Sequence, residues 1–486
     1  MSTTLAQTRR EDLTAPKGGS RDEPSLYVVL EGDRISAGGL RVPLVGVDEL
    51  RINRGATRSF RLEEGRKATL EVPDARMSGK HARLVREDAG WLFEDVGSTN
   101  GSFVEGKRVT QTAIDESAVI TLGATCFLFD PAEVIPEGAP AVAVDSASLR
   151  SRPRGMATLV PSVEATMPRL VRVAMSKLSI LLLGESGAGK EVLARTVHKL
   201  SARPGPFVAI SCGALAPTLV ESQLFGYVKG AFSGALKDEP GLIRASSGGT
   251  LFLDEVGELT PSAQATLLRV LQEKEVLPIG STKPVPVDLR VVAATLKPID
   301  QSPMFREDLY ARISAFVHRL APLRERRGDL GILAGDLLTH IAPERAPKVR
   351  IAADLGTALV GHDYPLNVRE LEHVLSVALV TTSEDILRLE SIGDALKSAR
   401  RATPSSPPDA EPAARQTGAR AAVRPTPAAP AKVLSDDDQR LKADLVEALS
   451  RTHGNVSEIA RTMGKTRMQI HRWMKRFALD PESFRS

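Results

Sequence analysis

The sequence has few cysteines, few aromatic residues and no long apolar run. Two cysteines among 486 residues, Cys126 and Cys212, exclude a disulfide-stapled scaffold and a cysteine-rich zinc site, and they indicate a reducing compartment. Aromatic residues make up only 4%, so the cores must be mainly aliphatic. The longest aliphatic run, residues 178–183, is far shorter than the roughly 20 residues that span a bilayer. Because the N-terminus also lacks the apolar stretch of a secretory signal, we expect a cytoplasmic protein.

An excess of charge of one sign is missing too. Lysines and arginines number 64 and aspartates and glutamates 60, which leaves a net charge of +4. The chain as a whole is therefore not expected to bind polyanions, and any basic surface must be local. At roughly 100–200 residues per domain, the length predicts about three or four domains.

Composition and periodicity divide the chain into three folded blocks. Residues 27–131 contain short alternating apolar runs between Gly, Asn, Asp and Ser turns, which predicts an all-β fold. Residues 156–396 alternate apolar strands with helical patterns and then become helical only, which predicts an α/β sheet with a helical end. Residues 435–481 are helical throughout. The segments between them, 132–155 and the Pro/Ala-rich 397–434, are expected to be linkers.

A glycine-rich loop follows the apolar run LSILLL and opens the helical pattern KEVLARTVHKL. Glycines allow backbone N–H groups to surround phosphates, the start of the helix adds partial positive charge, and Lys190 can reach the outer phosphates. This loop reads GESGAGKE, and its residues are the expected ATP ligands: Gly184, Glu185, Ser186, Gly187, Ala188, Gly189, Lys190 and Glu191.

A second nucleotide motif, GGTLFLDEVGEL, lies about 65 residues further along the chain. Its apolar strand ends in Asp254 and Glu255, which places two carboxylates at the carboxyl edge of the predicted sheet. We expect Asp254 to hold Mg²⁺, directly or through water, and Glu255 to polarise the attacking water as a general base. The two motifs together predict an ATPase that uses ATP and Mg²⁺.

Residues 156–396 resemble the AAA+ ATPase domain of sigma-54-dependent transcription activators, the bacterial enhancer-binding proteins. The loop GESGAGKE, including Glu191, and the hexapeptide GAFSGA both match that family. The resemblance implies a helical lid and a loop that contacts sigma-54, formed by Gly230, Ala231, Phe232, Ser233, Gly234 and Ala235. From the segments FREDLYARI and YPLNVRELEH it implies two arginine fingers, Arg306 and Arg312, and a sensor arginine over the γ-phosphate, Arg369. Fingers that act on a neighbouring subunit's ATP imply a ring, usually a hexamer in this family.

Several positions depart from the family pattern. Ser233 stands where threonine is usual, Ser211 replaces the asparagine that bonds the catalytic glutamate, and Leu296 replaces the sensor asparagine. Leu366 replaces a glycine, and residues 227–228, Tyr-Val, replace His-Glu just before the loop. None of these changes removes a primary catalytic group. Nucleotide sensing and turnover rate are the properties that we expect them to affect.

The first block resembles a forkhead-associated (FHA) domain, a β-sandwich that binds phosphothreonine peptides with loops at one end. The motifs that carry the resemblance are GR at 65–66, SGKH at 78–81 and STNG at 98–101. A phosphate dianion needs a guanidinium and short hydroxyl or amide donors, and the resemblance implies Arg66, Arg76, Ser78, Thr99 and Asn100. His81 is expected to be a buried scaffold residue. A Ser/Thr kinase or its substrate would then supply the phosphothreonine. A degenerate FHA fold used only for protein contacts remains the alternative.

The last block reads as helix, short turn, helix, and its charge is local. Residues 451–479 carry seven lysines or arginines against one glutamate, the excess expected where a helix meets phosphates. The block resembles the Fis-type helix-turn-helix that closes these activators. The residues expected to contact DNA are Thr466, Arg467, Gln469, Arg472 and Lys475.

The leading hypothesis is an ATP-dependent activator of sigma-54 RNA polymerase that binds upstream DNA and responds to a phosphothreonine signal. One alternative is an AAA+ protein-remodelling ATPase that is not coupled to sigma-54. Another is a DNA-bound repressor whose altered sensor positions impair ATP turnover. The GAFSGA hexapeptide argues against the remodeller, and the retained catalytic residues argue against the repressor.

Overall fold

The computed structural model describes residues 19–88, 90–213, 217–392 and 436–452, with the single positions 396, 459 and 474. The chain divides into two compact units, residues 1–406 and 407–486. The helix expected at the start of the last block is confirmed as α12 (Asp436–Arg451), whose Leu445, Ala448 and Leu449 are buried at helical spacing. Across the described residues no helix is long and apolar enough to cross a membrane.

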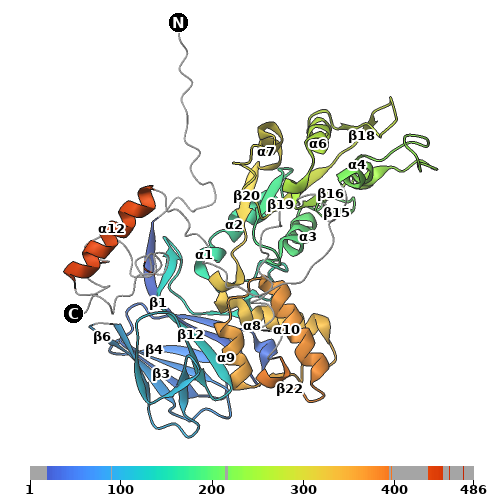
Figure 1. The fold of residues 1–486 in the computed structure, drawn as a ribbon. Helices are drawn as coiled ribbons and strands as arrows, with labels where there is room; N and C mark the ends of the chain where they lie inside the picture. Colours follow the sequence, from blue (N-terminus) through green and yellow to red (C-terminus); the bar gives the residue numbers. More distant parts are fainter. Residues whose placement is uncertain are drawn as a thin grey trace, which may run out of the picture. The chain divides into compact units, whose positions relative to one another are not determined.

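The first block is an all-β sandwich, as expected (Figure 1). One sheet has the order β13-β2-β1-β12-β11-β8-β9 and the other the order β10-β7-β6-β3-β5-β4. Their strands are β1 (Ser20–Glu31), β2 (Leu40–Pro43), β3 (Glu49–Arg54), β4 (Ser59–Glu63), β5 (Lys67–Val72), β6 (Ala82–Glu87), β7 (Gly90–Asp95), β8 (Ser102–Val104), β9 (Lys107–Val109), β10 (Gln111–Ile114), β11 (Ala118–Leu122), β12 (Thr125–Pro136) and β13 (Val144–Asp145). Pairs are antiparallel except β3–β5, and an apolar core fills the space between the sheets.

The expectation of a linker over 132–155 is wrong for much of that segment. Strand β12 continues to Pro136, and β13 pairs with β2 at the edge of the first sheet. The short 3-10 helix η2 (Ser146–Leu149) follows, and Leu149 is buried. Its paired parts are short pieces at a sheet edge, too short to give the segment a sustained periodicity in sequence. The second expected linker, 397–434, lies outside the described residues.

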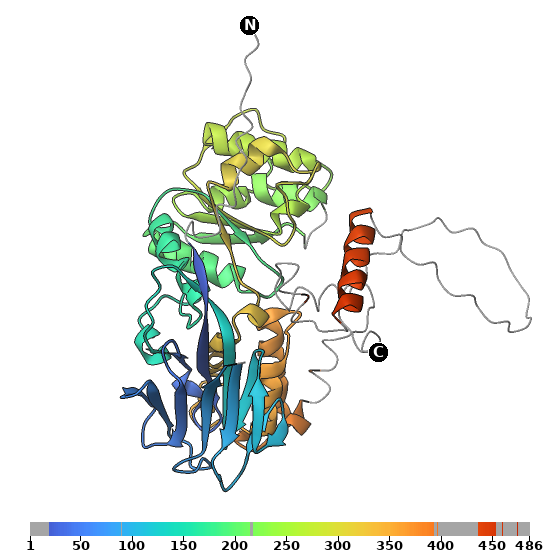
Figure 2. The ribbon, with the colours of Figure 1, turned by 90° about the vertical axis from the view of Figure 1, so that its left-hand side faces the viewer.

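The central domain has a parallel sheet with the order β15-β16-β19-β14-β20, which confirms the predicted α/β block (Figure 2). Its strands are β14 (Ile180–Leu183), β15 (Phe207–Ser211), β16 (Thr250–Asp254), β19 (Arg290–Thr295) and β20 (Phe316–Arg319). The helices are α1 (Pro161–Glu164), α2 (Met167–Ala174), α3 (Lys190–Leu200), α4 (Pro217–Phe225), α5 (Gly241–Ala245), α6 (Pro261–Glu273) and α7 (Glu307–Ile313), with η3 (Val256–Glu258) and the small hairpin β17 (Glu275–Val276) and β18 (Val285–Pro286).

Both faces of this central sheet are buried. Leu181, Leu253 and Val291 join the core beneath α4, α6 and α7, whereas their neighbours Leu182 and Phe252 join the core beneath α2 and α3. Alternate side chains of a strand point to opposite faces, so a strand buried on both sides must be apolar throughout. This requirement explains the continuous runs ILLL and LFLD in the sequence.

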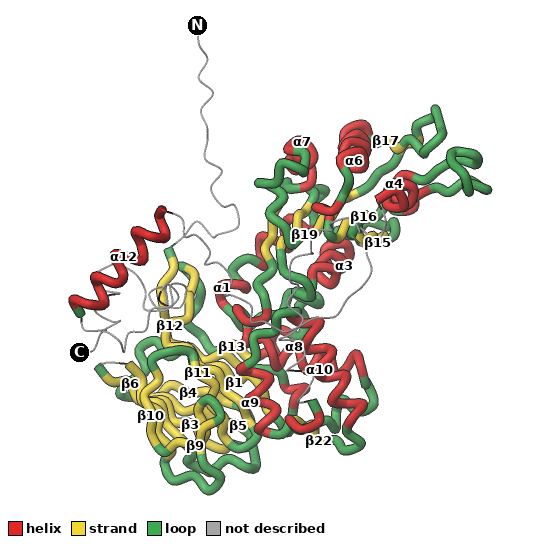
Figure 3. Tube along the Cα trace, viewed as in Figure 1, coloured by secondary structure: helices red, strands yellow, loops and turns green. Residues whose placement is uncertain are grey.

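Helices and short strands after the sheet form the expected lid (Figure 3). They are η4 (Leu323–Glu325), η5 (Arg327–Asp329), α8 (Leu330–Ile341), β21 (Arg350–Ile351), α9 (Ala353–Gly361), α10 (Asn367–Thr381), β22 (Ile386–Leu387) and η6 (Leu389–Ser391). Helices α8 and α9 lie beside β1, β11 and β12 of the sandwich and share one apolar core with them (Figure 1).

Candidate functional site

The glycine-rich loop connects β14 to α3 at the carboxyl edge of the central sheet, as the sequence predicts. Gly189 has φ +100° and opens to free space, since a Cβ there would meet no heavy atom within 4 Å. The Nζ of Lys190 donates to the carbonyl oxygens of Gly184 and Glu185, both at 3.0 Å. Burial lowers the pKa of Lys190, and the charges of Asp254 and Glu255 oppose that change. The lysine is therefore folded against its own loop, within the field of both carboxylates.

The two carboxylates lie at the end of β16, next to the glycine-rich loop. Ser211 is opposite Asp254 in the β15–β16 register, and its Oγ donates to Oε2 of Glu255 at 3.3 Å. The serine therefore contacts the carboxylate that an asparagine would hold in the family pattern. Glu255 has φ +53°, a left-handed conformation that costs a non-glycine residue about 1–2 kcal/mol. Such strain at an exposed carboxylate is typical of a functional position.

The lid reaches the glycine-rich loop through the start of α10. The N–H of Val368 donates to the carbonyl of Gly187 at 3.0 Å, and Nη1 of Arg369 donates to Oγ of Ser186 at 3.0 Å. Gly187 has φ +73°, and a Cβ on it would lie 2.1 Å from the carbonyl oxygen of Leu366. The loop and the lid therefore meet backbone to backbone, and the predicted sensor arginine is on this contact.

A buried asparagine ties the same two elements together. Asn367 is fully buried with φ +55°, and its Oδ1 accepts from the N–H of Leu323 at 2.8 Å. Its Nδ2 donates to Oε2 of Glu185 at 3.1 Å and to the carbonyl of Ser186 at 3.0 Å. One amide group thus joins η4 and α10 of the lid to the glycine-rich loop.

Two lid arginines add charge to this contact. Arg324 makes a bidentate ion pair with Glu185 at 2.6 and 2.8 Å, and this hydrogen-bonded pair lowers the pKa of Glu185. Arg326 donates to the carbonyl of Ala188 at 3.0 Å. Asn367, Arg324 and Arg326 were missed by the sequence reasoning, although they lie in the segments LRERRGDL and NVRELEH that flank the predicted sensor arginine.

A cavity of about 390 Å³ lies between the loop and the lid. Its lining includes Gly189 and Val192 from α3 and its cap, His318 from β20, and Leu337 and Val368 from the lid. Burial lowers the pKa of His318 to about 4, so the imidazole is neutral near pH 7. The cavity is largely apolar and adjoins the glycine-rich loop, which suits the base and sugar of a nucleotide whose phosphates meet that loop.

The residues present also fit Mg²⁺ held together with phosphates. In the described part of the chain no cluster of three or more His, Cys, Asp or Glu could hold a metal by itself. Mg²⁺ is commonly bound by one or two carboxylates together with substrate phosphates and water. Asp254 at the end of β16 supplies the one carboxylate that such a site requires.

The hexapeptide 230–235 forms a tight turn at the end of a projecting segment. The N–H of Gly230 donates to the carbonyl of Ala235 at 2.9 Å, and Gly230 and Gly234 have φ of +82° and +107°. Phe232 is 46% exposed, and its ring lies edge-on to Tyr227 with 4.9 Å between the centroids. The departure at position 227 therefore gives Phe232 an aromatic neighbour. Ser233 is exposed.

The predicted arginine fingers lie at α7. Arg306 is the residue before the helix and pairs with Asp308 at 2.8 Å, and Arg312 is exposed in the last turn. Both residues are exposed to solvent. Their exposure is compatible with a role in a neighbouring subunit.

The sandwich brings together four of the five residues expected to bind phosphothreonine. The N–H of Thr99 donates to Oγ of Ser78 at 3.1 Å, and Nδ2 of Asn100 donates to the carbonyl of Arg76 at 2.7 Å. His81 is fully buried; its Nδ1 accepts from the N–H of Ser78 at 3.0 Å, as a scaffold residue would.

Asp95 holds the second of these loops. Burial opposes its ionisation, but hydrogen bonds from Ser102, Ser98 and the N–H of Gly97 lower its pKa to about 2. The carboxylate is therefore ionised, and the turn that presents Thr99 and Asn100 is fixed in place.

The expectation that Arg66 shares this site is wrong. Arg66 precedes β5, where Lys67 is opposite Glu49, whereas Ser78 meets the far end of the same strand pair, where Arg54 is opposite Val72. Six residues of strand separate the two ends by roughly 20 Å. Arg66 instead pairs with Asp48 at 3.1 Å. The arginine beside Ser78 is Arg54, which is exposed and whose N–H donates to the carbonyl of Ser78 at 3.0 Å.

Two further expectations concern the sensor position at Leu296 and the residues that contact DNA. Leu296, where a sensor asparagine is usual, is exposed, and the hydroxyl of the neighbouring Thr295 accepts from the N–H of Lys297 at 3.0 Å. The residues expected to contact DNA lie outside the described residues: Thr466, Arg467, Gln469, Arg472 and Lys475.

Three family models match the chain. A sigma-54 interaction domain matches residues 157–318, an AAA+ ATPase lid domain matches 324–408, and an FHA domain matches 58–123. These matches agree with the central domain, the lid and the sandwich seen in the structure.

Several known proteins are similar to this chain. The sigma54-dependent transcriptional activator SfnR of Pseudomonas putida is 43% identical over 237 residues, which cover 48% of this chain and 65% of SfnR. The transcriptional regulatory protein GlrR of Escherichia coli K12 is 30% identical over 477 residues, 96% of this chain and 97% of GlrR. A solved structure of NtrX from Brucella abortus in complex with ADP is 26% identical and covers 65% of this chain and 68% of its own, with a TM-score of 0.45. The chain therefore spans nearly all of GlrR but less than two thirds of SfnR, and it belongs to the family of sigma-54-dependent transcriptional activators.

Proposed function

We propose that this protein hydrolyses ATP to activate transcription by sigma-54 RNA polymerase, binds upstream DNA through residues 435–481, and responds to a phosphothreonine protein through its sandwich. The observation that carries the proposal is the pairing of a nucleotide-type loop with a separate glycine-bounded turn that presents Phe232 46% exposed. A generic remodelling ATPase has no need of the second feature. The family membership supports the same activity.

The proposed chemistry assigns one task to each group. Lys190 exchanges its two carbonyl partners for phosphate oxygens when ATP binds. Glu255 orients the attacking water, and Ser211 holds that carboxylate from the side. Arg369 moves from Ser186 toward the outer phosphate. Asp254 would hold Mg²⁺, which would supply neutralisation of the charge on the phosphates.

Completion of each site requires a second subunit. Arg306 and Arg312 are exposed, and we assign them to the nucleotide of a neighbouring subunit rather than to that of their own chain. A guanidinium supplied by a neighbour stabilises the charge of phosphoryl transfer and contributes roughly 10³–10⁵ in rate. A homo-oligomeric ring, in this family usually a hexamer, follows from this requirement. Turnover per subunit should therefore rise with protein concentration.

The coupling role of the turn is tested by Phe232→Ala. The ring lies outside the nucleotide residues, so hydrolysis should stay within a few-fold of the parent. Removal of the large apolar contact should abolish binding to sigma-54 in the presence of an ATP transition-state analogue, and should abolish open-complex formation. The measurement pairs steady-state hydrolysis with promoter opening on the same preparations. Open complexes formed as well as by the parent would remove the turn from the coupling role.

The input role is tested by two arginines that the structure separates. Arg54 is beside Ser78 and Arg66 is roughly 20 Å away, so Arg54→Ala should abolish binding of a phosphothreonine peptide library and Arg66→Ala should not. The full-length protein is screened against matched phosphorylated and unphosphorylated libraries. Absence of any enrichment for phosphothreonine would favour a degenerate sandwich that makes protein contacts only.

The DNA role rests on the local positive charge of residues 451–479. Truncation after residue 434 should remove footprints from upstream DNA while leaving ATP hydrolysis in place. Footprints that survive the truncation would refute the assignment.

A further inference from the structure

The sandwich has two apolar faces on one sheet, and only one of them faces its own core. In β1, Leu26 and Val28 join the sandwich core, whereas Tyr27 and Val29 join the core of the lid. The same alternation recurs in β12, where Phe127 faces the sandwich. Its neighbours Cys126 and Leu128 join the lid core instead, as does Val119 of β11. A sheet with one solvated face should alternate apolar and polar residues. The run SLYVVLE therefore encodes a second buried face.

The lid packs so closely against this face that backbone atoms of the two parts are in contact. The N–H of Ile351 in β21 donates to the carbonyl of Gly32 at 2.7 Å. On α8, a Cβ at Gly331 would lie 2.0 Å from the carbonyl oxygen of Val29, and on α9 a Cβ at Gly356 would lie 2.8 Å from Sγ of Cys126. The backbone contact excludes any larger residue at Gly331, and a larger residue at Gly356 would displace the Cys126 side chain. The contact is therefore specified by sequence.

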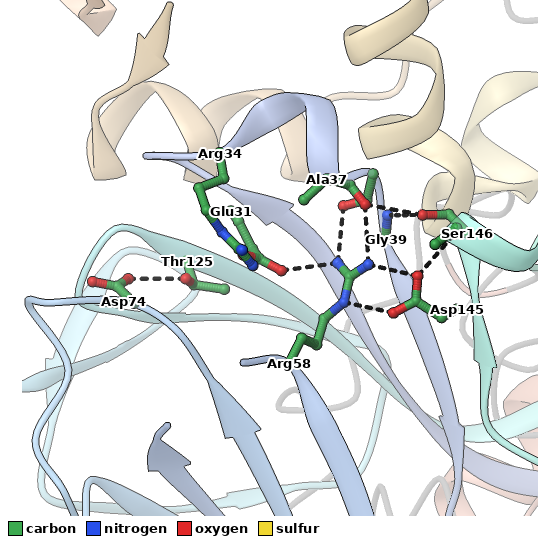
Figure 4. Close-up of polar contacts among 11 residues, drawn as sticks. Glu31, Arg34, Ala37, Gly39, Arg58, Asp74, Thr125, Asp145 and Ser146 are labelled. Atoms are coloured by element: carbon green, nitrogen blue, oxygen red, sulfur yellow. Dashed lines mark hydrogen bonds and ion pairs between the residues drawn. The ribbon is translucent and has the colours of Figure 1, made fainter. Parts of the chain in front are cut away.

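A buried arginine fixes the edge of this interface. Arg58 is only 7% exposed; it pairs with Glu31 and Asp145, both at 2.8 Å, and donates to the carbonyl of Ala37 at 3.0 Å (Figure 4). The segment that Arg58 contacts through Ala37 also lies against the lid, because a Cβ at the nearby Gly39 would be 3.6 Å from the carbonyl oxygen of Gly328. Loss of Arg58 would leave the buried Glu31 with Arg34 as its remaining cation and would leave the partly exposed Asp145 without its ion pair.

The interface also adjoins the loop of the sandwich that carries Arg76 and Ser78. Arg58 follows Arg54 by four residues. Asp74 accepts from the N–H of Arg76 at 2.8 Å and from Oγ1 of Thr125 at 2.8 Å, and so ties that loop to the start of β12 (Figure 4). On its other side the lid contacts the glycine-rich loop through α10, which packs in the same core as α8 and α9.

We propose that the sandwich and the lid are one rigid body, locked at its edge by Arg58, so that the sandwich moves with the lid when nucleotide closes the cleft. The surface formed by β1, β11 and β12 is then reserved for the lid of the same chain. The inference rests on the proposed function only in taking the cavity between the glycine-rich loop and the lid as the nucleotide site. Ligand capture by the sandwich would reach the glycine-rich loop through a single packed core, and nucleotide would alter the sandwich reciprocally.

A disulfide across the interface tests the rigid body. The hydroxyls of Thr121 and Thr357 are 2.8 Å apart, close enough for a Thr121→Cys, Thr357→Cys pair in the full-length protein, with Cys126→Ser to remove a competing thiol. We expect the pair to oxidise readily and the oxidised protein to hydrolyse ATP within two-fold of the reduced protein. No disulfide in the folded protein would overturn the docking. A disulfide that slows hydrolysis ten-fold or more, reversibly on reduction, would overturn the rigid body. A reduced protein without ATPase activity would refute the proposed function, while the cross-link would still report the docking.

Hydrogen exchange at one amide tests the lock. The Ile351 amide should be protected in the full-length parent because its acceptor lies on the sandwich. Arg58→Met should speed its exchange at least ten-fold, while the amides between β3 and β6 keep their protection and show that the sandwich stays folded. Arg61→Met is the matched control, since Arg61 is 61% exposed and pairs only with Glu71 among the described residues. Unchanged Ile351 protection in Arg58→Met, or an unprotected Ile351 in the parent, would overturn the proposal.

Discussion

Asn367 offers the sharpest test of how the lid holds the glycine-rich loop. Asn367→Ala removes the acceptor of the Leu323 N–H and the donor to Glu185 and Ser186. A buried group left without its partner costs about 1–3 kcal/mol. Alanine at φ +55° adds about 1 kcal/mol, because asparagine tolerates the left-handed region better. The free energy of unfolding should therefore fall by about 2–4 kcal/mol.

The same change should weaken nucleotide binding, since Glu185 and Ser186 lie in the loop that meets the phosphates. We expect the dissociation constant of fluorescent mant-ADP to rise about ten-fold or more. Asn367→Gly separates the two causes: it removes the same hydrogen bonds but should recover about 1 kcal/mol of stability, because glycine accepts positive φ. Denaturant unfolding and mant-ADP titration are measured on both variants.

A result in which Asn367→Ala unfolds and binds as the parent does would refute the reasoning, because no other described side chain contacts η4, Glu185 and Ser186 together. Equal stability of the alanine and glycine variants would contradict only the energetic cost assigned to alanine at positive φ. Weaker mant-ADP binding with unchanged stability would place the amide in ligand recognition rather than in holding the lid.

Further predictions concern catalysis, pH and coupling. Lys190→Ala should lose ATP binding, whereas Glu255→Gln should bind ATP without hydrolysing it; steady-state and binding assays check both. Burial lowers the pKa of His318 to about 4, so neutral His318 contributes stability above about pH 6.5 that is lost as pH falls toward 4. From pH 7 to pH 4, His318→Gln should therefore lose about 3 kcal/mol less unfolding free energy than the parent, measured by denaturant titration at both pH values. Ser233→Thr should preserve or improve promoter opening, and Ser233→Ala should weaken it, with hydrolysis unchanged in both.

The sequence predicted the structure wherever a single physical requirement, such as positive φ or burial on both faces, determined the residue types. The glycine-rich loop needs φ values that favour glycine, and a doubly buried strand needs an apolar run, so the nucleotide edge of the central sheet could be located before its geometry was known. The lid contacts could not, because Asn367 and Arg324 act across more than 130 residues of chain separation. No local pattern encodes which loop such a side chain will meet.

The misplacement of Arg66 has a related cause. The pair Gly65-Arg66 matches a short motif, but strand register decides which end of a strand meets the loops, and register depends on partners far away in sequence. Ser59–Glu63 forms an extra strand, β4, between Arg54 and Arg66. That strand moves the second arginine to the opposite end of the sandwich.

The distribution of contacts around the glycine-rich loop indicates where nucleotide is sensed. On the sheet side the usual asparagine is the exposed Leu296, and the hydroxyl of Thr295 is engaged by the backbone of Lys297. On the lid side Arg324, Asn367 and the α10 backbone all contact the loop directly. The state of the phosphates should therefore be transmitted mainly through the lid, because that is where a moved loop must break and remake hydrogen bonds. Since the lid shares its core with the sandwich, we expect sensing to be concentrated on the same body that carries the loops proposed to bind phosphothreonine.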